Sequence, residues 1–223
     1  MAARGVFVTG TDTGVGKTVV AVALLRALAA QGARAAGMKP VAAGIDATTG
    51  RNADVLALSD AAGVKLPFEG INPYAFAEPI APHVAAAREG RAIELDVIAR
   101  AYAGIAAQAD AIVVEGAGGA LVPIDRSHDM LDVAALLRLP VVLVVGVRLG
   151  CLNHALLSAL AIRRRGLQFA AWVATRIDPA MRSAEASVEA LEERLPAPCI
   201  GDFARADDVA FEADALRALH LAP

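Results

Sequence analysis

The stretch "GVFVTGTDTGVGKT", residues 5–18, decides the fold expected for this chain. Its second half almost matches the phosphate-binding pattern G-x-x-x-x-G-K-[ST], but five residues instead of four separate Gly10 from Gly16. An apolar, strand-like run precedes it and a helical pattern follows, which is the context that a phosphate loop requires. We therefore expect Lys17 to contact terminal phosphates and the Thr18 hydroxyl to bind magnesium. A glycine-rich turn without a ligand is the alternative that this stretch alone leaves open.

Apolar runs of strand length alternate with helical patterns along the chain. The 223 residues are 57% hydrophobic but only 4% aromatic, so the core must consist mainly of Ala, Val, Leu and Ile. This alternation predicts an α/β fold, with a mainly parallel sheet covered by helices on both faces, in a single domain spanning residues 1–223. Strands are expected at 5–10, 33–40, 110–116, 139–147, 169–175 and 197–201, and helices at 17–32, 93–108, 129–139, 152–166 and 183–195.

Charge and hydropathy argue against several classes of partner. The formal net charge of -3 lacks the basic excess of a nucleic-acid-binding protein. The longest apolar run, at 139–147, is too short for a membrane span, and the first strand leaves no room for a signal peptide. Cys151 and Cys199 form neither a C-x-x-C pair nor a metal-ligand spacing. We expect a cytoplasmic protein that binds neither nucleic acid nor membrane.

One segment, residues 65–83, interrupts the alternation of strands and helices. Its four prolines are incompatible with an ordinary helix or a central strand. We expect a long ordered excursion here, and long loops in compact domains are often functional.

The segment "AIVVEGAGGAL", residues 111–121, places a carboxylate at the end of a buried strand. In open α/β sheets, ligands bind outside the carboxyl ends of the strands. Glu115 is therefore expected to face the same crevice as the phosphate loop and to bind magnesium there, while the following glycines allow a ligand to approach closely. The alternative is a carboxylate that only caps the turn after the strand.

Lys39 and Asp54 are weaker candidates for the same crevice. In "GMKPVAAG", residues 37–44, Lys39 ends the second expected strand and would bring a second cation close to Lys17. Asp54 begins a helical pattern and could be a second magnesium ligand. A solvated lysine and an ordinary first-turn acid are the alternatives.

The segment "GVRLGCLNHALL", residues 146–157, has the pattern of a strand, a glycine turn and a helix beginning near Asn153. Free N–H groups at such a helix start form a natural site for a carboxylate. His154 lies in the first turn of this helix, where a lone histidine is more often structural than catalytic.

Together these segments make the chain resemble the dethiobiotin synthetases, a family of P-loop enzymes. The resemblance covers nearly the whole length and is carried, in order, by "VTGTDTGVGKT", "GMKPVAAG", "NPYAFAEPIAPH", "VEGAGG" and "GVRLGCLNHA". It implies the three-layer P-loop NTPase fold. It also explains the additional residue, because the phosphate loop of this family is one residue longer than the usual one.

The resemblance implies an ATP-dependent reaction on a diamine. In this family, an amine of 7,8-diaminononanoate reacts with CO2 to form a carbamate, which ATP phosphorylates. The neighbouring amine then displaces phosphate and closes the ureido ring of dethiobiotin. Positioning and charge neutralisation are sufficient for such chemistry, which is consistent with the lack of a nucleophilic triad.

The resemblance also assigns roles to individual positions. Lys39, Lys17 and Thr13 match the catalytic positions, and Thr18, Asp54 and Glu115 match the magnesium ligands. A homodimer is implied, in which the helix start of one subunit binds the carboxylate of the substrate held by the other. The ATP-binding positions are Gly14, Val15, Gly16, Lys17, Thr18, Val19, Asp54, Glu115, Gly116, Ala117, Gly118, Thr175 and Arg176, and the substrate-binding positions are Thr13, Lys39, Ala43, Gly118, Gly150, Cys151, Leu152 and Asn153.

Three positions depart from the pattern of the family. Ala43 stands where relatives often carry a serine, and Gly14 stands where some carry a glutamate. Thr175 replaces an asparagine that reads the adenine edge, so we expect looser selectivity for the nucleotide base than in relatives with asparagine. Residues 202–208 are expected to complete the base pocket.

Two other groups of the same superfamily are alternatives. Switch ATPases of the partitioning or cell-division type usually carry an early lysine in the loop, near Thr11 or Asp12, and none occurs here. Amide-forming synthetases of corrinoid biosynthesis usually carry an added glutamine-hydrolysing domain, for which 223 residues leave no room.

Overall fold

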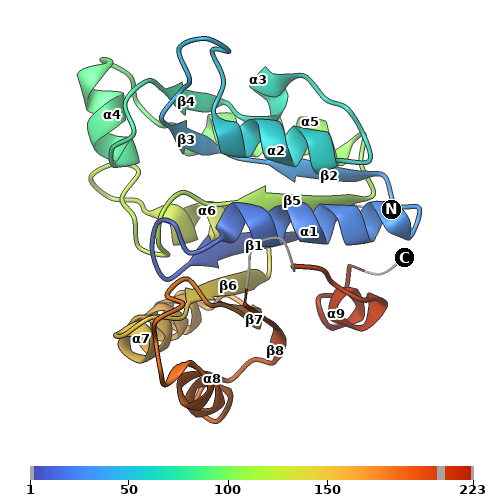
Figure 1. Ribbon diagram of the computed structural model, residues 1–223. Helices are drawn as coiled ribbons and strands as arrows, with labels where there is room; N and C mark the ends of the chain where they lie inside the picture. Colours follow the sequence, from blue (N-terminus) through green and yellow to red (C-terminus); the bar gives the residue numbers. More distant parts are fainter. Residues whose placement is uncertain (1–2, 205–208, 222–223) are drawn as a thin grey trace.

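The computed structural model describes residues 3–204 and 209–221, and its centre is a six-stranded parallel sheet (Figure 1). The strands lie in the order β2-β5-β1-β6-β7-β8, and each neighbouring pair is parallel. The predicted mainly parallel sheet is therefore confirmed. Its strands are β1 (Arg4–Gly10), β2 (Ala35–Met38), β5 (Ala111–Glu115), β6 (Val141–Gly146), β7 (Phe169–Thr175) and β8 (Cys199–Phe203).

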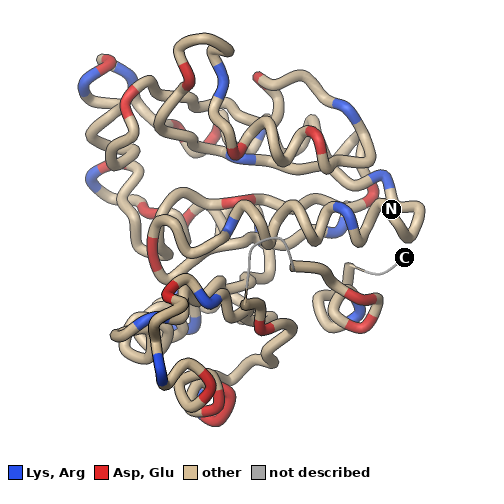
Figure 2. Tube along the Cα trace, in the orientation of Figure 1, with Lys and Arg blue, Asp and Glu red and all other residues tan. Residues whose placement is uncertain are grey.

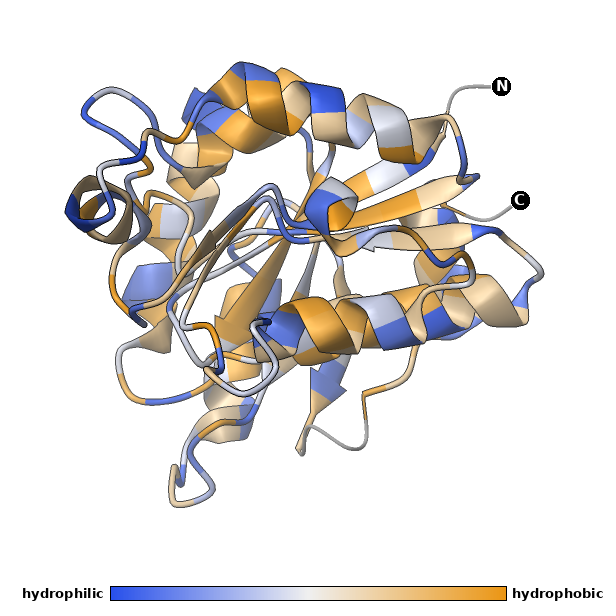
Figure 3. Cartoon of the chain, turned by 90° about the horizontal axis from the view of Figure 1, so that it is seen from above, coloured by the Kyte–Doolittle hydropathy of each residue, from blue (hydrophilic) through white to orange (hydrophobic). Residues whose placement is uncertain are grey.

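Aliphatic side chains of the strands pack into two hydrophobic layers, one on each face of the sheet. In β1, Val6 and Val8 pack on one face and Phe7 on the other, as the period of two in a strand requires. Both faces are buried, so the strands consist of nearly continuous apolar residues (Figure 3). This is why the strands could be predicted as short apolar runs.

Helices cover both faces of the sheet and complete the three layers. One face carries α1 (Lys17–Ala30), α2 (Ala53–Ala61) and α9 (Ala213–Ala218). The other face carries α5 (Leu95–Ala106), α6 (Met130–Leu137), α7 (Cys151–Arg164) and α8 (Ala184–Glu192). The five predicted helices are all present, with ends that differ by a few residues, and α7 begins at Cys151 rather than near Asn153.

The proline-containing excursion forms a small unit beside the main sheet. It contains α3 (Phe68–Ile71), β4 (Tyr74–Phe76) and the start of α4 (Pro82–Arg88), and β4 pairs in parallel with β3 (Val41–Ala43). The segment thus has neither a long helix nor a strand of the main sheet, as its prolines predict. Helix α4 was not predicted. Pro82 occupies its first turn, where proline is tolerated because a backbone N–H at that position has no partner within the helix.

The sheet reverses its direction of strand addition at β1. The chain passes from β1 to the β2 side of the sheet, and after β5 it crosses to β6 on the other side of β1. Ligands of open α/β sheets bind at the carboxyl ends of strands next to such a switch point. The phosphate loop lies there, between β1 and α1.

Charged residues of both signs are spread over the described part of the chain. Lys and Arg alternate with Asp and Glu along most of the trace (Figure 2), which matches the small net charge. Within residues 3–204 and 209–221, no helix is long and apolar enough to cross a membrane.

Candidate active site

The phosphate loop is folded tightly against the ends of β1 and β6. Gly14 and Gly16 have φ angles of 73° and 90°, a region that favours glycine. Val15 between them is buried, and a Cβ on Gly10 or on Gly146 would lie within 2.7 Å of its side chain. The glycine N-cap of α1 makes no side-chain cap hydrogen bond, so the first-turn N–H groups of α1 are left for a ligand.

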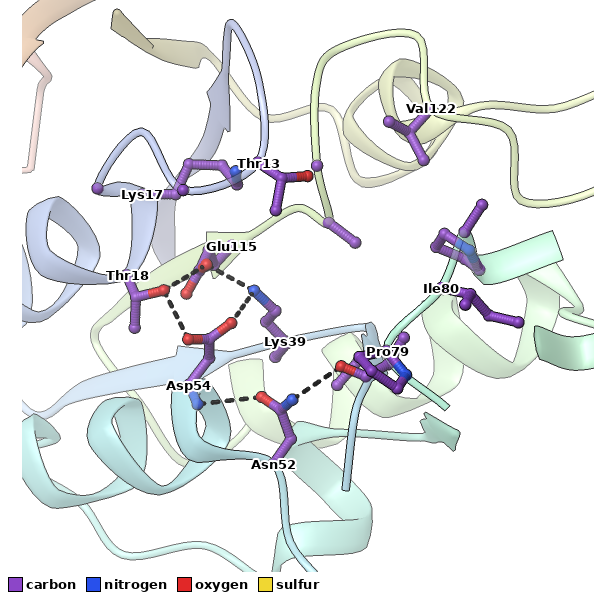
Figure 4. A pocket seen from close by; sticks show the side chains of 18 of the residues that line it. Thr13, Lys17, Thr18, Lys39, Asn52, Asp54, Pro79, Ile80, Glu115 and Val122 are labelled. Carbon is purple, nitrogen blue, oxygen red and sulfur yellow. Dashed lines mark hydrogen bonds and ion pairs between the residues drawn. The ribbon is translucent and has the colours of Figure 1, made fainter. Parts of the chain in front are cut away.

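Four side chains from four separate segments of the chain meet in front of this loop (Figure 4). The Lys39 ammonium donates to Glu115 Oε1 at 2.5 Å and to Asp54 Oδ2 at 2.8 Å. The Thr18 hydroxyl lies 2.9 Å from Asp54 Oδ1 and 2.9 Å from Glu115 Oε1. The alternatives of a solvated lysine and of a carboxylate that only caps a turn are therefore wrong.

The register of the sheet brings Lys39 to Glu115. Met38 of β2 pairs with Val114 of β5, so Lys39, which follows β2, emerges beside Glu115, the last residue of β5. Asp54 arrives from α2, whose N-cap Asn52 accepts from the Asp54 N–H. Thr18 comes from the start of α1, so two strand ends and two helix starts fix the cluster independently of any ligand.

Burial and pairing set the charges in this cluster. Burial acts to lower the pKa of Lys39, but the Glu115 and Asp54 carboxylates outweigh it and hold that pKa above its usual value. Burial raises the pKa of Glu115, although Lys39 opposes the shift. Burial also acts to raise the pKa of the half-buried Asp54, but Lys39 reverses this and leaves the pKa below its usual range.

Lys17 is the second cation of the site. Its ammonium donates to the Asp12 carbonyl at 2.8 Å, across the loop. Burial, followed by the charge on Lys39, lowers the pKa of Lys17 to about 8. A triphosphate placed in the loop would oppose both effects on the pKa of Lys17, because its negative charge favours the charged form of the ammonium.

The oxygen atoms of this cluster fit a magnesium ion. Thr18, Asp54 and Glu115 offer one hydroxyl and two carboxylates, and Glu115 Oε2 is buried without a hydrogen-bond partner. Among the described residues, no group of three or more His, Cys, Asp or Glu side chains could hold a metal by itself. Magnesium commonly binds through one or two carboxylates plus phosphate oxygens and water, so this donor set matches a nucleotide-bound ion.

A cavity of about 680 Å³ opens in front of the cluster, within the size range of small-ligand sites. The loop and the four-residue cluster form its polar end, while the excursion and the segment after β5 form an apolar wall. Twelve predicted site residues line it, namely Thr13, Gly14, Gly16, Lys17, Thr18, Val19, Lys39, Ala43, Asp54, Glu115, Ala117 and Gly118.

Other predicted residues lie outside this cavity. The Val15 side chain packs beneath the loop, and Gly116 lies against the Phe7 ring. Residues 150–153 form the turn and start of α7 and do not line the cavity of their own chain. Of the expected base pocket at 202–208, residues 205–208 lie outside the part of the chain that the structure describes.

The side chains of Thr175 and Arg176 are engaged within the protein. The Thr175 hydroxyl donates to the Val15 carbonyl at 2.6 Å. The Arg176 guanidinium forms a bidentate pair with Asp202 and a further pair with Glu185. Both side chains therefore already have partners within the protein, and neither lines the cavity.

Several residues that shape the site were not predicted from the sequence. Asn52 donates to the carbonyls of Ala43 and Gly44, and Asn72 donates to the Lys39 carbonyl at 2.7 Å. These amides bond to backbone groups, which leave no pattern in the sequence beyond the asparagine itself. Apolar wall residues were also missed, namely Ala42, Pro79, Ile80, Ala81, Pro82 and Val122.

Comparisons with known proteins agree with this geometry. A family model described as an AAA domain matches residues 4–213. ATP-dependent dethiobiotin synthetase BioD of Nitrosospira multiformis is 52% identical over 198 residues, which cover 89% of this chain and 87% of that protein. The chain belongs to the dethiobiotin synthetase family. Proteins of the same name from Xanthomonas euvesicatoria and Aromatoleum aromaticum are 50% and 48% identical, with 87% and 89% of this chain covered and 88% and 89% of each relative.

Solved structures of lower identity share the fold. The MinC:MinD cell division protein complex of Aquifex aeolicus gives a TM-score of 0.57 at 16% identity, covering 97% of this chain and 85% of that chain. The cell division protein FtsY of Thermotoga maritima gives 0.53 at 18% identity, covering 99% and 69%. At these identities the likeness extends to the fold alone. The synthetases, by contrast, match over most of the sequence at about 50% identity.

Proposed function

We propose that this chain is an ATP-dependent dethiobiotin synthetase. The observation that carries the proposal is the Lys39–Glu115–Asp54–Thr18 cluster in front of a phosphate loop, in a chain about half identical to proteins of that name. The substrates would be 7,8-diaminononanoate, CO2 and ATP, and the products dethiobiotin, ADP and phosphate. A cytoplasmic location accords with the unpaired Cys151 and Cys199.

The reaction proceeds in three steps. An amine of the substrate adds to CO2 and loses a proton, which gives a carbamate anion. The γ-phosphoryl group of ATP passes to a carbamate oxygen, so ADP leaves and that oxygen becomes a good leaving group. The second amine then attacks the carbonyl carbon and loses a proton, phosphate leaves, and the five-membered ureido ring closes.

The residues of the site would position these groups and balance their charge. Lys17 and the N–H groups of the loop would hold the phosphates, and Lys39 would donate to the carbamate and the transferring phosphoryl group from the facing side. Thr18, Asp54 and Glu115 would hold magnesium, which neutralises phosphate charge when bound. Thr13 and the backbone after Glu115 would contact the substrate.

A homodimer completes the proposed site. The start of α7 offers free N–H groups for a carboxylate, but it does not line the cavity of its own chain. Exposed leucines lie along the same helix and in the turn before it, and contiguous exposed apolar residues mark interaction surfaces. We name this set the α7 leucine face; it consists of Leu149, Leu152, Leu156, Leu157 and Leu160.

The experiment that tests the function is phosphate release from MgATP, measured with and without diaminononanoate and bicarbonate. Release is expected only when both are present, with one dethiobiotin formed per phosphate. A switch-type ATPase, the alternative within this fold, would release phosphate regardless of the diamine, and that result would reject the synthetase proposal.

A further inference from the structure

We propose that Thr175 is a positioning residue that holds the phosphate loop in its anion-binding shape, rather than a residue that reads the nucleotide base. The inference rests on the proposed nucleotide site. It assigns a function to the side chain at the carboxyl end of β7, a strand that is not adjacent to β1 in the sheet.

The hydroxyl of Thr175 has one proton, and the protein already uses it. Its Oγ1 lies 2.6 Å from the Val15 carbonyl and 3.2 Å from the Val145 carbonyl, and the residue is only 7% exposed. The shorter distance identifies Val15 as the main acceptor. A base could therefore receive no hydrogen bond from this hydroxyl without breaking the bond to the loop.

The bond to Val15 fixes the orientation of a functional peptide group. In a planar trans peptide, the N–H points opposite to the C=O. Thr175, at the end of β7, holds the Val15 carbonyl, so the Gly16 N–H points in the opposite direction, away from Thr175. Gly16 and Lys17 both line the cavity. Such loop N–H groups bind phosphate oxygens, so Thr175 would act on the phosphates through Gly16.

Packing restricts the same peptide on its other sides. A Cβ on Gly16 would lie 3.3 Å from Thr175 Cγ2, so the threonine methyl group rests against the glycine. The Val15 side chain is held between Gly10 and Gly146, where a Cβ on either glycine would lie at 2.7 Å or less. Thr175 thus fixes both the Val15 carbonyl and the following glycine, while Gly10 and Gly146 fix the valine side chain.

The test is nucleotide binding by Thr175→Val, which keeps the shape of the side chain but removes the hydroxyl. Affinities for ADP, CDP, GDP and inorganic tripolyphosphate, with magnesium, are measured by calorimetry. We expect all four to weaken by a similar factor of about tenfold, because the lost orientation affects phosphate contacts common to all. Thr175→Ser restores the donor and should bind within about twofold of the original protein.

Ser187→Ala is the matched control. The Ser187 hydroxyl is also buried and also donates to a backbone carbonyl, that of Ser183 at 2.9 Å, but it lies on α8. It should lower the melting temperature without changing nucleotide affinity. If Thr175→Val does not fold, Thr175→Ala is measured in the same way.

Three results would overturn the proposal. The first is a loss in Thr175→Val no larger than in Ser187→Ala, and the second is a loss confined to one base with tripolyphosphate binding unchanged. The third is a Thr175→Ser variant as weak as Thr175→Val. Because binding is measured without the diamine, each result is independent of whether the chain proves to be a synthetase.

Discussion

At the scale of single residues, Lys17 links nucleotide affinity to pH. Its pKa of about 8, lowered first by burial and then by Lys39, means that the free protein loses this positive charge as the pH rises through 8. A bound nucleoside diphosphate would favour the charged form of Lys17 and raise its pKa. Affinity for ADP should therefore fall as the pH rises from 7.5 to 9.5, in a range where the phosphates no longer titrate.

Calorimetry in buffers of different ionisation enthalpy checks this expectation for Lys17. Proton uptake on ADP binding should be small at pH 7 and approach one proton near pH 9. Lys17→Arg, which stays charged throughout this range, should bind without proton uptake. Proton release, or uptake that is the same in Lys17→Arg, would contradict the assignment.

Lys39 is the residue for which turnover and binding should separate most clearly. Lys39 lines the cavity, and its ammonium lies between the carboxylates of Glu115 and Asp54. Lys39→Ala should lower kcat by a factor of about 100 or more, while the Kd for ADP changes far less. The measurements are steady-state phosphate release and direct ADP titration.

The surface variant Lys65→Ala serves as the control for charge removal, because that side chain is 66% exposed and does not line the cavity. A Lys39→Ala variant with near-full kcat would remove Lys39 from its catalytic role.

At the scale of elements, Asn52 joins β3 to the start of α2. Its Oδ1 caps the helix through the Asp54 N–H, and its Nδ2 donates to the carbonyls of Ala43 and Gly44. Asn52→Ala should lower the free energy of unfolding by about 1–2 kcal/mol, the usual cost of a lost N-cap. It should also weaken MgADP binding, since Asp54 loses its anchor.

Urea unfolding and MgADP titration measure both effects of Asn52→Ala. Ser183→Ala is the control, because Ser183 is the N-cap residue of α8 yet makes no side-chain cap hydrogen bond. Unfolding free energies that are equal in the two variants would show that the Asn52 bonds do not anchor α2.

The elements also explain which parts of the site the sequence could predict. The phosphate loop, Glu115 and Lys39 follow strands that read as apolar runs, so the rule that ligands bind at the carboxyl ends of strands was enough to bring them together. The bond from Thr175 to Val15 spans 160 positions and ends on a backbone carbonyl. Nothing in the local pattern of either segment indicates it, and the side chain instead suggested contact with a base.

At the scale of the whole molecule, one chain does not supply every group that the proposed site requires. The cavity has cations and oxygens at its phosphate end, but among the described residues its lining includes no cation beyond Lys17 and Lys39 to hold a substrate carboxylate. The start of α7 offers such a site and adjoins the α7 leucine face, where Leu149 is 89% exposed. A second copy that covers this face would bring the two halves of the site together.

Leu160→Asp tests the dimer because it places a charge on the α7 leucine face, two turns away from the helix start. Burying an unpaired carboxylate in an apolar contact is costly, so the variant should be monomeric by sedimentation velocity at micromolar concentration. Turnover should be largely lost, while the Kd for ADP stays within about twofold, since the phosphate loop belongs to one chain. Leu136→Asp, at a leucine of α6 with the same 38% exposure as Leu152, should leave both mass and turnover unchanged. A monomeric Leu160→Asp protein with full turnover would show that each chain carries a complete site, and an unaltered dimer would place the contact on another face.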